Sequence, residues 1–207
     1  MPLAGDAEIF SVNNRWRLQG PINNAGNDLT FRVNAGDIEI RNNGIAGSGD
    51  VIKEGNGNLV IFNGTNNTFT GALRINDGQV DARDTQSLGA VGGGTFVGNG
   101  GTLLVRDGRT FAENNIEITG TGHNGRGAIR SENNSNTLTG QVTLTGDSRI
   151  HVNNTQLTLS GVLGQSGGNR NLEKTGAGTL ILSNSGNTLA GQIAVSQGTL
   201  QADSPGA

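Results

Sequence analysis

The sequence predicts an all-β protein built as a parallel β-solenoid, a stack of about ten coils of roughly 20 residues each. Three observations lead to this fold class. Apolar residues occur in short alternating pairs, glycine and asparagine interrupt every apolar run, and one segment recurs later in the chain with its motifs in the same order. The alternation is the two-residue period of strands that bury one face. No stretch keeps helical spacing over the roughly ten uninterrupted residues that a helix needs.

The composition favours an ordered chain that is rich in turns. Hydrophobic residues make up 32 % and charged residues 15 %, while 36 of the 207 residues are glycine. A disordered chain of such low hydrophobicity usually has a high net charge and many prolines. Here the net charge is −3 and there are three prolines, so order is the better interpretation. Cysteine is absent, which excludes disulfides and thiolate metal sites.

Strands are expected wherever two apolar residues flank a single residue that faces the other side of the sheet. The clearest pairs, in chain order, are Leu59/Ile61, Ile116/Ile118, Val142/Leu144, Leu157/Leu159, Leu180/Leu182 and Ile193/Val195. Residues 1–50 show the alternation alone, without a repeat motif. We expect one solenoid domain over residues 1–207.

Two segments, 51–83 and 172–203, repeat one order of motifs: a lysine, two glycines, an apolar pair, an Asn-Thr-x-x-Gly turn and a strand that starts at glycine. The motifs of the first copy are Lys53, Leu59/Ile61, 67–71 and 78–80, and those of the second are Lys174, Leu180/Leu182, 187–191 and 198–200. A partial copy spans 136–160. A fixed repeat of this kind is the mark of stacked units that bury one continuous core.

The length of a coil follows from the apolar pairs: 21 residues separate Leu59 from Val80, and 20 separate Leu180 from Leu200. Antiparallel hairpins would need regular two-residue turns between runs of equal length, and the joins here vary. Glycine and asparagine are expected at corners where φ is positive. Asparagine has an alternative role in side-chain ladders between coils. Lys53 and Lys174 occupy equal repeat positions, which predicts a place near the glycine corners for both.

These motifs resemble the autotransporter-associated β-strand repeat. The signature of that family is a lysine, a Gly-x-Gly-Thr-Leu-x-Leu segment, an Asn-Thr-aromatic-Thr-Gly turn, a strand and Gly-Thr-Leu; residues 174–182 and 198–200 match it closely. Asn58 and Leu189 depart from it, at a threonine and at the aromatic position. The resemblance implies a right-handed parallel β-helix in the passenger of a type V secreted bacterial protein, located outside the cell or on its surface. It implies a structural and display role that aids export, and it carries no catalytic residues.

Two motifs that match enzyme signatures lack the context that their chemistry requires. Residues 164–168 fit a nucleophile elbow around Ser166, but such an elbow joins a strand to a helix and needs a base. Residues 120–125 fit a dinucleotide fingerprint, but no helix is expected after them to receive the phosphate. We therefore expect no catalytic, cofactor-binding or metal-binding residues, and no enzymatic activity. An ordinary corner is the expected role of the Ser166 loop.

A carbohydrate-active enzyme is the remaining enzymatic alternative, because such β-helices place two or three carboxylates on neighbouring coils. Asp77, Asp81 and Asp84 are candidates, with Asp203 one repeat further on. The competing interpretation places Asp81 and Asp203 just outside a core strand, facing water. Aromatic residues, which usually surround a sugar in such sites, make up 3 % of the chain.

Adhesion is the alternative to a purely structural role. The segment from Arg106 to Asn136 departs from the repeat pattern, and we expect it to form either a longer polar loop or a patch that binds a cell-surface or glycan ligand. The residues of that patch would be Arg106, Arg109, His123, Arg126 and Arg130. Nucleic acid is not expected as a partner, because no basic cluster is present.

The ends of the chain carry further expectations. No signal peptide is visible, and no apolar stretch approaches the roughly 20 residues of a membrane span, so this segment is not expected to insert into a membrane. Targeting and outer-membrane anchoring are expected from other parts of a larger autotransporter chain. Only five residues follow Ala202, and no capping element is visible there. End-to-end self-association is therefore a further expectation.

Overall fold

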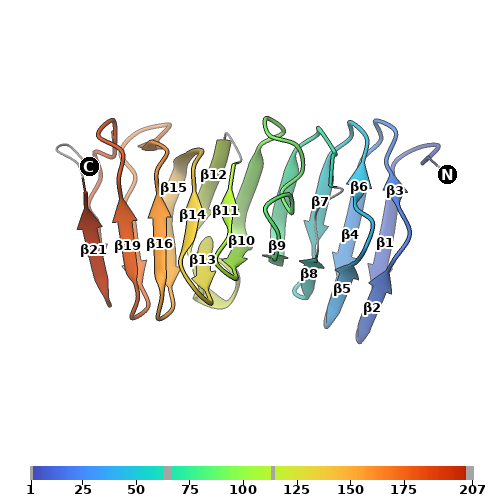
Figure 1. The fold of residues 1–207 in the computed structure, drawn as a ribbon, viewed down its shortest axis with the longest axis horizontal. Coiled ribbons are helices and arrows are strands. Elements are labelled where there is room, and N and C mark those ends of the chain that lie inside the picture. The colour runs from blue at the N-terminus through green and yellow to red at the C-terminus, as the bar shows by residue number, and fades with distance from the viewer. Residues whose placement is uncertain (1, 63–66, 113–114, 204–207) are drawn as a thin grey trace.

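The computed structural model describes residues 2–62, 67–112 and 115–203, and within them the chain is all-β (Figure 1). Every pairing between its strands is parallel. The one helical element in these ranges is a short 3-10 turn, η1 (His123–Gly125). The strands stack side by side into an elongated solenoid, so the predicted fold class is confirmed.

Each coil presents up to three strands, which form three faces of the solenoid. The first face holds β1 (Ala7–Ser11), β4 (Leu29–Val33), β7 (Val51–Glu54), β12 (Asn115–Gly120) and β17 (Leu163–Gln165). The second face holds β2 (Arg15–Leu18), β5 (Asp37–Ile40), β8 (Asn58–Ile61), β13 (Ile129–Glu132), β18 (Leu172–Thr175) and β20 (Ile193–Val195). Three long strands run through both faces: β9 (Leu73–Ala82), β10 (Thr95–Arg106) and β15 (Gln141–Val152).

The third face consists of two smaller sheets. Near the N-terminus it contains β3 (Ile22–Asn23) and β6 (Ile45–Ala46). Towards the C-terminus it contains β11 (Thr110–Phe111), β14 (Asn136–Leu138), β16 (Gln156–Leu159), β19 (Thr179–Leu182) and β21 (Thr199–Ala202).

The solenoid has about nine turns, because nine strands follow one another along the longest path of the main sheet. Residues that pair between neighbouring coils are 20 positions apart at Leu180 and Leu200, and 28 apart at Gly120 and Ser148. The expected coil of roughly 20 residues therefore lies at the short end of the observed range. The longest coils fall in the middle of the chain, where the repeat motif is weakest.

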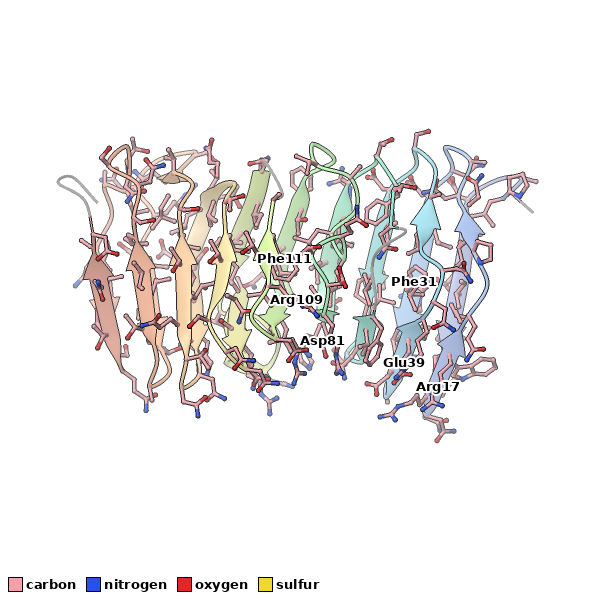
Figure 2. The ribbon with its side chains drawn as sticks, in the orientation of Figure 1. Arg17, Phe31, Glu39, Asp81, Arg109 and Phe111 are labelled. Carbon is pink, nitrogen blue, oxygen red and sulfur yellow. The ribbon has the colours of Figure 1, made fainter. Side chains whose placement is uncertain are left out.

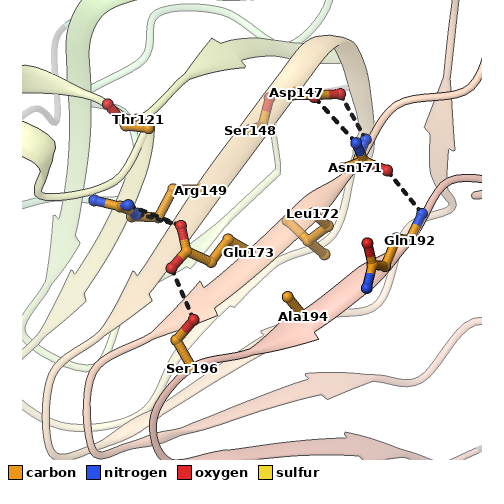
Figure 3. Close-up of a pocket in the computed structure, with 10 residues that line it drawn as sticks. All are labelled: Thr121, Asp147, Ser148, Arg149, Asn171, Leu172, Glu173, Gln192, Ala194 and Ser196. Atoms are coloured by element: carbon orange, nitrogen blue, oxygen red, sulfur yellow. Dashed lines mark hydrogen bonds and ion pairs between the residues drawn. The ribbon is translucent and has the colours of Figure 1, made fainter.

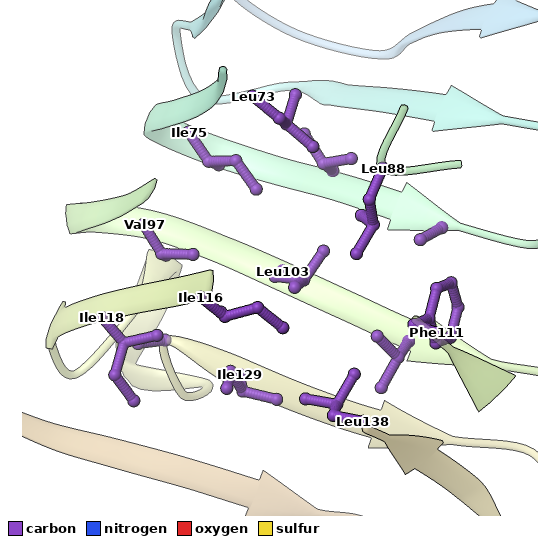
Figure 4. Packing of buried hydrophobic residues seen from close by; sticks show 14 of the residues in the cluster. Leu73, Ile75, Leu88, Val97, Leu103, Phe111, Ile116, Ile118, Ile129 and Leu138 are labelled. Atoms are coloured by element: carbon purple, nitrogen blue, oxygen red, sulfur yellow. The ribbon is translucent and has the colours of Figure 1, made fainter. Parts of the chain in front are cut away.

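The core consists of columns of inward-facing side chains, one residue from each coil. On the second face Ile38, Leu59, Val80 and Leu103 follow one another in register, and all are fully buried. Figure 4 shows such residues from several coils packed against one another inside the solenoid. Burial of this apolar surface at about 25 cal/mol per Å² is the main favourable contribution to folding.

Asparagines occupy corners with left-handed backbone, one of the two roles expected for them. Asn14, Asn42, Asn124, Asn133 and Asn134 all adopt positive φ, which confirms the tolerance of left-handed backbone. Buried asparagines bond to the backbone of the neighbouring coil, as Asn136 does by accepting from the amides of Gly108 and Arg109 at 3.0 Å. Asn63 and Asn184 stand at the same position of the two repeats, which makes them the candidates for a side-chain ladder, and Asn63 lies outside the described residues. Asn184 donates to the carbonyl oxygen of Ser160 at 3.0 Å.

The two repeat copies lie on different faces of the solenoid. In the first copy the lysine strand β7 is on the first face and β8 is on the second. In the second copy the equivalent strands, β18 and β19, lie on the second and third faces. From β7 the chain passes through β9, β10, β12 and β15 to β17, which is five complete turns on the first face. It then continues to the second face, where β18 lies. The copies are therefore one face out of phase.

Candidate functional site

The lysine of each repeat joins two consecutive corners of the solenoid. Lys53 is fully buried, and its Nζ donates to the carbonyl oxygens of Glu54 at 2.7 Å and Gly55 at 2.5 Å in its own corner. A third bond, of 3.2 Å, reaches the carbonyl oxygen of Asp77 in the next coil. An ammonium group has three donors, so all of them are used. Burial lowers the pKa of Lys53 to about 8.

The second copy reproduces this arrangement. Lys174 is also fully buried and donates to the carbonyl oxygens of Thr175 at 2.9 Å, Gly176 at 2.8 Å and Gln197 at 3.0 Å. Burial lowers its pKa as well. We call each of these groups a lysine clamp. Both lysines lie at glycine corners, as the sequence predicts. The sequence contains no other lysine.

The clamp requires a glycine in the corner above the lysine. Gly78 has φ +68°, and a Cβ added there would lie 2.3 Å from the carbonyl oxygen of Gly55 and 2.8 Å from Lys53 Nζ. Gly198 has φ +74° and equally close contacts in the second copy. The lysine and the glycine one coil later therefore form one unit, which explains why the motif contains both.

A ridge interrupts the corner between the first and second faces, after β12. It comprises residues 121–127, including η1, and replaces the short corner found in neighbouring coils. The amide of Gly127 donates to the carbonyl oxygen of Thr121 at 2.7 Å, which closes the loop. The hydroxyl of Thr102, on β10, accepts from the amide of His123 and donates to the carbonyl oxygen of Gly127, both at 2.8 Å. The ridge is thus fixed to the coil before it.

On one side of the ridge lies a groove of about 490 Å³, which we call the corner groove. Its polar floor comes from the corners of earlier coils and comprises Asn34, Asn56, Asn58 and Gln79. Its wall is the ridge, through His123, Asn124 and Arg126. Among these side chains, those of Asn34, Asn56, Gln79 and Arg126 make no hydrogen bond or ion pair within the described part of the chain. Their polar groups are therefore available to a ligand.

The corner groove has two cations, Lys53 below its floor and Arg126 on its wall, and the carboxylates of Asp77 and Glu54 lie near Lys53. The Lys53 ammonium lies close to Gly78 in the same corner, and Arg126 is exposed on the wall. Burial, followed by the nearby charges of Lys53 and Arg126, lowers the pKa of His123. His123 is therefore neutral at pH 7. Its Nε2 accepts from the side-chain amide of Asn124 at 2.8 Å, so Nδ1 is the ring nitrogen that can donate to a ligand. The carboxylate of Asp37 at the groove margin is already bonded by Asn58 and Arg15.

On the other side of the ridge is a second groove, of about 320 Å³, near the C-terminus (Figure 3). Its polar groups are already paired with one another. Arg149 binds Glu173 at 2.8 Å, and Ser196 donates to the same carboxylate at 2.8 Å. The side-chain amide of Asn171 donates to the carboxylate of Asp147, and its oxygen accepts from the backbone N–H of Gln192 at 2.9 Å. This groove has fewer free groups for a ligand than the corner groove has.

The segment from Arg106 to Asn136 is not a single polar loop. It contains β11, β12, β13 and the start of β14, and among its described residues the ridge is the part that departs from the coil. Arg126 and His123 lie on the ridge, whereas Arg130 binds Glu132 and Arg106 binds Asp81 at 3.3 Å. Arg109 is exposed next to the third face and does not line the corner groove (Figure 2). Of the five predicted residues, the structure brings His123 and Arg126 together in one groove; whether they bind a ligand stays a prediction.

The expectation that Asp81 faces water is wrong. Its exposed fraction is 3 %, because it lies on the outer side of the second face between two arginines. Arg83 binds it at 2.7 Å and Arg106 at 3.3 Å. Glu39 has the same position on an earlier coil and binds Arg17 at 3.0 Å and Arg41 at 2.7 Å, as Figure 2 shows for Glu39 and Arg17. These acids neutralise arginines along one face.

Asp203 is exposed, as expected. In the described ranges, no three His, Asp or Glu side chains are grouped so that they could hold a metal ion. Ser166 is exposed in the corner between β17 and β18, its amide bonds to the carbonyl oxygen of Leu144, and no helix follows it. A search of the same ranges for a helix of bilayer-spanning length and hydropathy finds none.

Comparison with known proteins identifies one family. The model of the passenger-associated-transport-repeat matches residues 51–82 and 172–202. Curated proteins and solved structures gave no significant match. The two matched segments are those in which the sequence resembles the autotransporter β-strand repeat, and each of them carries one lysine clamp. The resemblance is confirmed, and the chain contains at these two places the repeat of autotransporter passengers.

Proposed function

We propose that the chain is a structural and display module of a bacterial autotransporter passenger, which forms a rigid stalk and aids export. The observation that carries this proposal is the continuous parallel sheet from β1 to β20, with a lysine clamp in each matched repeat. A stack in which each coil contacts only its neighbours gives an extended and stiff body. The match to a passenger repeat supports a location outside the cell or on its surface. In the proposed arrangement, other parts of a larger chain anchor the module to the outer membrane.

The test uses the complete natural protein in intact bacteria. Leu180→Asp places a charge in the buried core of the second repeat, whereas Ile181→Asp changes the next residue, which is only partly buried on the outside. A buried, unpaired carboxylate prevents local folding. We expect Leu180→Asp to reduce the passenger that added protease can cleave on intact cells, and Ile181→Asp to leave that amount near the wild-type level. Equal surface amounts for both variants would contradict the proposed role.

Ligand binding, in the manner of an adhesin, is the second candidate function. The observation that favours it is the ridge, which departs from the repeat and borders a groove with unpaired polar side chains. Such a feature is not required for a stalk, since neighbouring coils turn the same corner without one.

We also propose that the isolated chain of 207 residues associates end to end. At one end Trp16 continues a core column and is 56 % exposed, and at the other Val195 stacks above Lys174 and is 47 % exposed. Contact between two such different ends is heterologous and forms open chains of molecules. Sedimentation over a concentration series should show growing species, and Val195→Glu should abolish them. Val91→Glu is the control, because Val91 is 58 % exposed and belongs to neither end coil. Strictly monomeric wild-type protein would refute the idea.

A further inference from the structure

We propose that the corner groove binds an oligosaccharide that carries carboxylate groups, with Arg126 pairing to a carboxylate and the amides of Asn34, Asn56 and Gln79 bonding to hydroxyls. This inference rests on the second candidate function, ligand binding at the ridge, and names its ligand class. Four unpaired polar side chains converge there from three consecutive coils and from the ridge.

The amides determine the neutral part of the ligand. Each amide side chain offers two N–H donors beside one carbonyl acceptor, a pattern that pairs with the hydroxyl groups of sugars. Asn34, Asn56 and Gln79 come from three consecutive coils, whose strands are about 4.8 Å apart. Gln79 is in register with Asn58, two residues beyond Asn56, so the amides are spread along the corner as well as across the coils. Amides spread over three coils favour an extended ligand with hydroxyls along its length. Neutral His123 adds one further donor at the wall.

The cations determine the charged part of the ligand. Arg126 is exposed and bonds to no carboxylate of the described chain, and a guanidinium binds carboxylates through two parallel hydrogen bonds. The buried Lys53 ammonium adds positive charge from below the floor, near Gly78. Asp37 is compensated by Arg15 and Asn58, and Glu54 accepts from Asn76 at 2.7 Å. Asp77 lies close by but does not line the groove. An anionic group on the ligand is therefore favoured over a cationic one.

The lining argues against a peptide or a nucleic acid. A peptide is anchored by apolar pockets or by a free strand edge, and the only apolar side chain that lines the groove in the described structure is Ala35. The strands next to this corner are already paired on both sides. A nucleic acid requires many cations, whereas the groove offers one exposed arginine.

Hydrogen bonds within the protein fix the conformation of the ridge in the absence of a ligand. Thr102 bonds to the start of η1 at His123 and to the end of the ridge at Gly127, and the Nη1 of Arg149 donates to the carbonyl oxygen of Gly125 at 2.6 Å from the opposite side. A wall that is held by bonds to coils on either side loses little conformational entropy on binding. The same bonds leave the side chain of Arg126 free.

The test measures binding of the wild-type chain to two acidic probes, oligogalacturonate and oligosialic acid, by calorimetry. Each probe is paired with a carboxyl-reduced counterpart of equal length. We expect binding of at least one acidic probe and at least about tenfold weaker binding of its reduced form, because the charge-assisted pair is lost. Tighter binding of one of the two acidic probes shows which type of acidic sugar the corner groove binds. Equal binding of an acid and its reduced form would overturn the inference while retaining ligand binding, and no binding of any probe would overturn the inference.

Variants locate the site. Arg126→Ala should weaken binding by about tenfold or more. Its thermal unfolding should stay unchanged, because the guanidinium makes no hydrogen bond or ion pair with residues that the structure describes. Gln79→Ala should weaken binding to a smaller extent. Arg109→Ala is the matched control, since Arg109 is equally an exposed arginine but lies outside the corner groove. Loss of binding in Arg109→Ala, or unchanged affinity in Arg126→Ala, would place the site elsewhere and refute the assignment.

Discussion

Replacing Leu180 with alanine is expected to lower the free energy of unfolding by about 2–5 kcal/mol, because it opens a cavity in a stacked core. Leu180 is fully buried and lies in register between Leu157 and Leu200 on the third face. Coils on both sides are fixed by backbone hydrogen bonds, so they close over the cavity only in part. Urea unfolding followed by circular dichroism measures the change.

Two further substitutions make this result interpretable. Leu59→Ala changes the equivalent residue of the first repeat, which is also fully buried, and we expect a similar loss of stability. Leu200→Ala changes the same column in the last described coil, where the side chain is only partly buried, and we expect a loss of less than about 1 kcal/mol. A change within about 0.5 kcal/mol for Leu180→Ala would mean that its side chain does not contribute to the core.

The strands could be predicted from the sequence because burial on one face imposes a local pattern. All the apolar pairs singled out from Leu59/Ile61 to Leu180/Leu182 lie in strands with both members buried. Ile193 and Val195 also form a strand but are exposed, since β20 is the last strand on its path through the described sheet. The alternation therefore records the direction of a side chain, whereas its burial also depends on the presence of the next coil.

The shift of the two repeats by one face could not be predicted. Self-comparison of the sequence aligns Lys53 with Lys174 and says nothing about which face each occupies. The placement depends on the lengths of the coils in between, and these vary: 21 residues separate Ile129 from Ile150, whereas 26 separate Leu103 from Ile129. The ridge adds residues at one corner, and the register between β12 and β15 shifts just before it, between Ile118 and Gly120. The clamp is nevertheless the same in both copies, so each repeat carries its own corner geometry.

The burial of Asp81 depends on two arginines, one near it in the sequence and one far from it. Arg83 is two residues away on the same side of the strand, and Arg106 comes from the following coil. Glu39 and Arg41 show the same acid-x-arginine pattern two coils earlier. That spacing was a usable signal, because residues two apart on a strand share a face.

The sequence alone indicates only some of the residues that line the corner groove. His123 and Arg126 stand out because their segment breaks the repeat. Asn34, Asn56 and Gln79 appear as ordinary corner residues, and they join the site only because the ridge folds back over earlier coils. The direction of that fold-back depends on the bonds of Thr102 to the ridge, a long-range contact that local patterns do not encode.

Replacing Lys53 or Lys174 with methionine should lower the free energy of unfolding by about 2–4 kcal/mol, since three carbonyl acceptors lose their donor at roughly 1 kcal/mol each. Methionine has a similar length and fills the same space, so the effect reports the hydrogen bonds more than the volume. Equal losses in the two variants would show that the clamp acts in the same way on two different faces. The control is Arg32→Met, an exposed cation paired with Glu8 on the surface, which should change stability little.

The pH dependence of stability offers an independent measurement of the same clamp. Lysine in an unfolded chain has a pKa of about 10.4, and burial lowers that of Lys53 to about 8. Between these values the unfolded chain binds more protons than the folded chain, so the free energy of unfolding should rise with pH. Tyrosine and cysteine are absent, so lysine is the one side-chain type that titrates over this window. The rise should shrink in Lys53→Met and nearly vanish when Lys174 is replaced as well.

Acylation of amines tests the burial of the clamps without any substitution. Both lysines have no exposed surface, and all exposed cationic side chains in the described chain are arginine or histidine. An amine-reactive ester should therefore leave Lys53 and Lys174 unmodified in the folded protein, and should modify both in urea, as read by mass spectrometry of their peptides. Opening of a single coil would expose one lysine before the other. Rapid modification of either lysine under native conditions would show that its ammonium is not held by the three carbonyl oxygens of its corners.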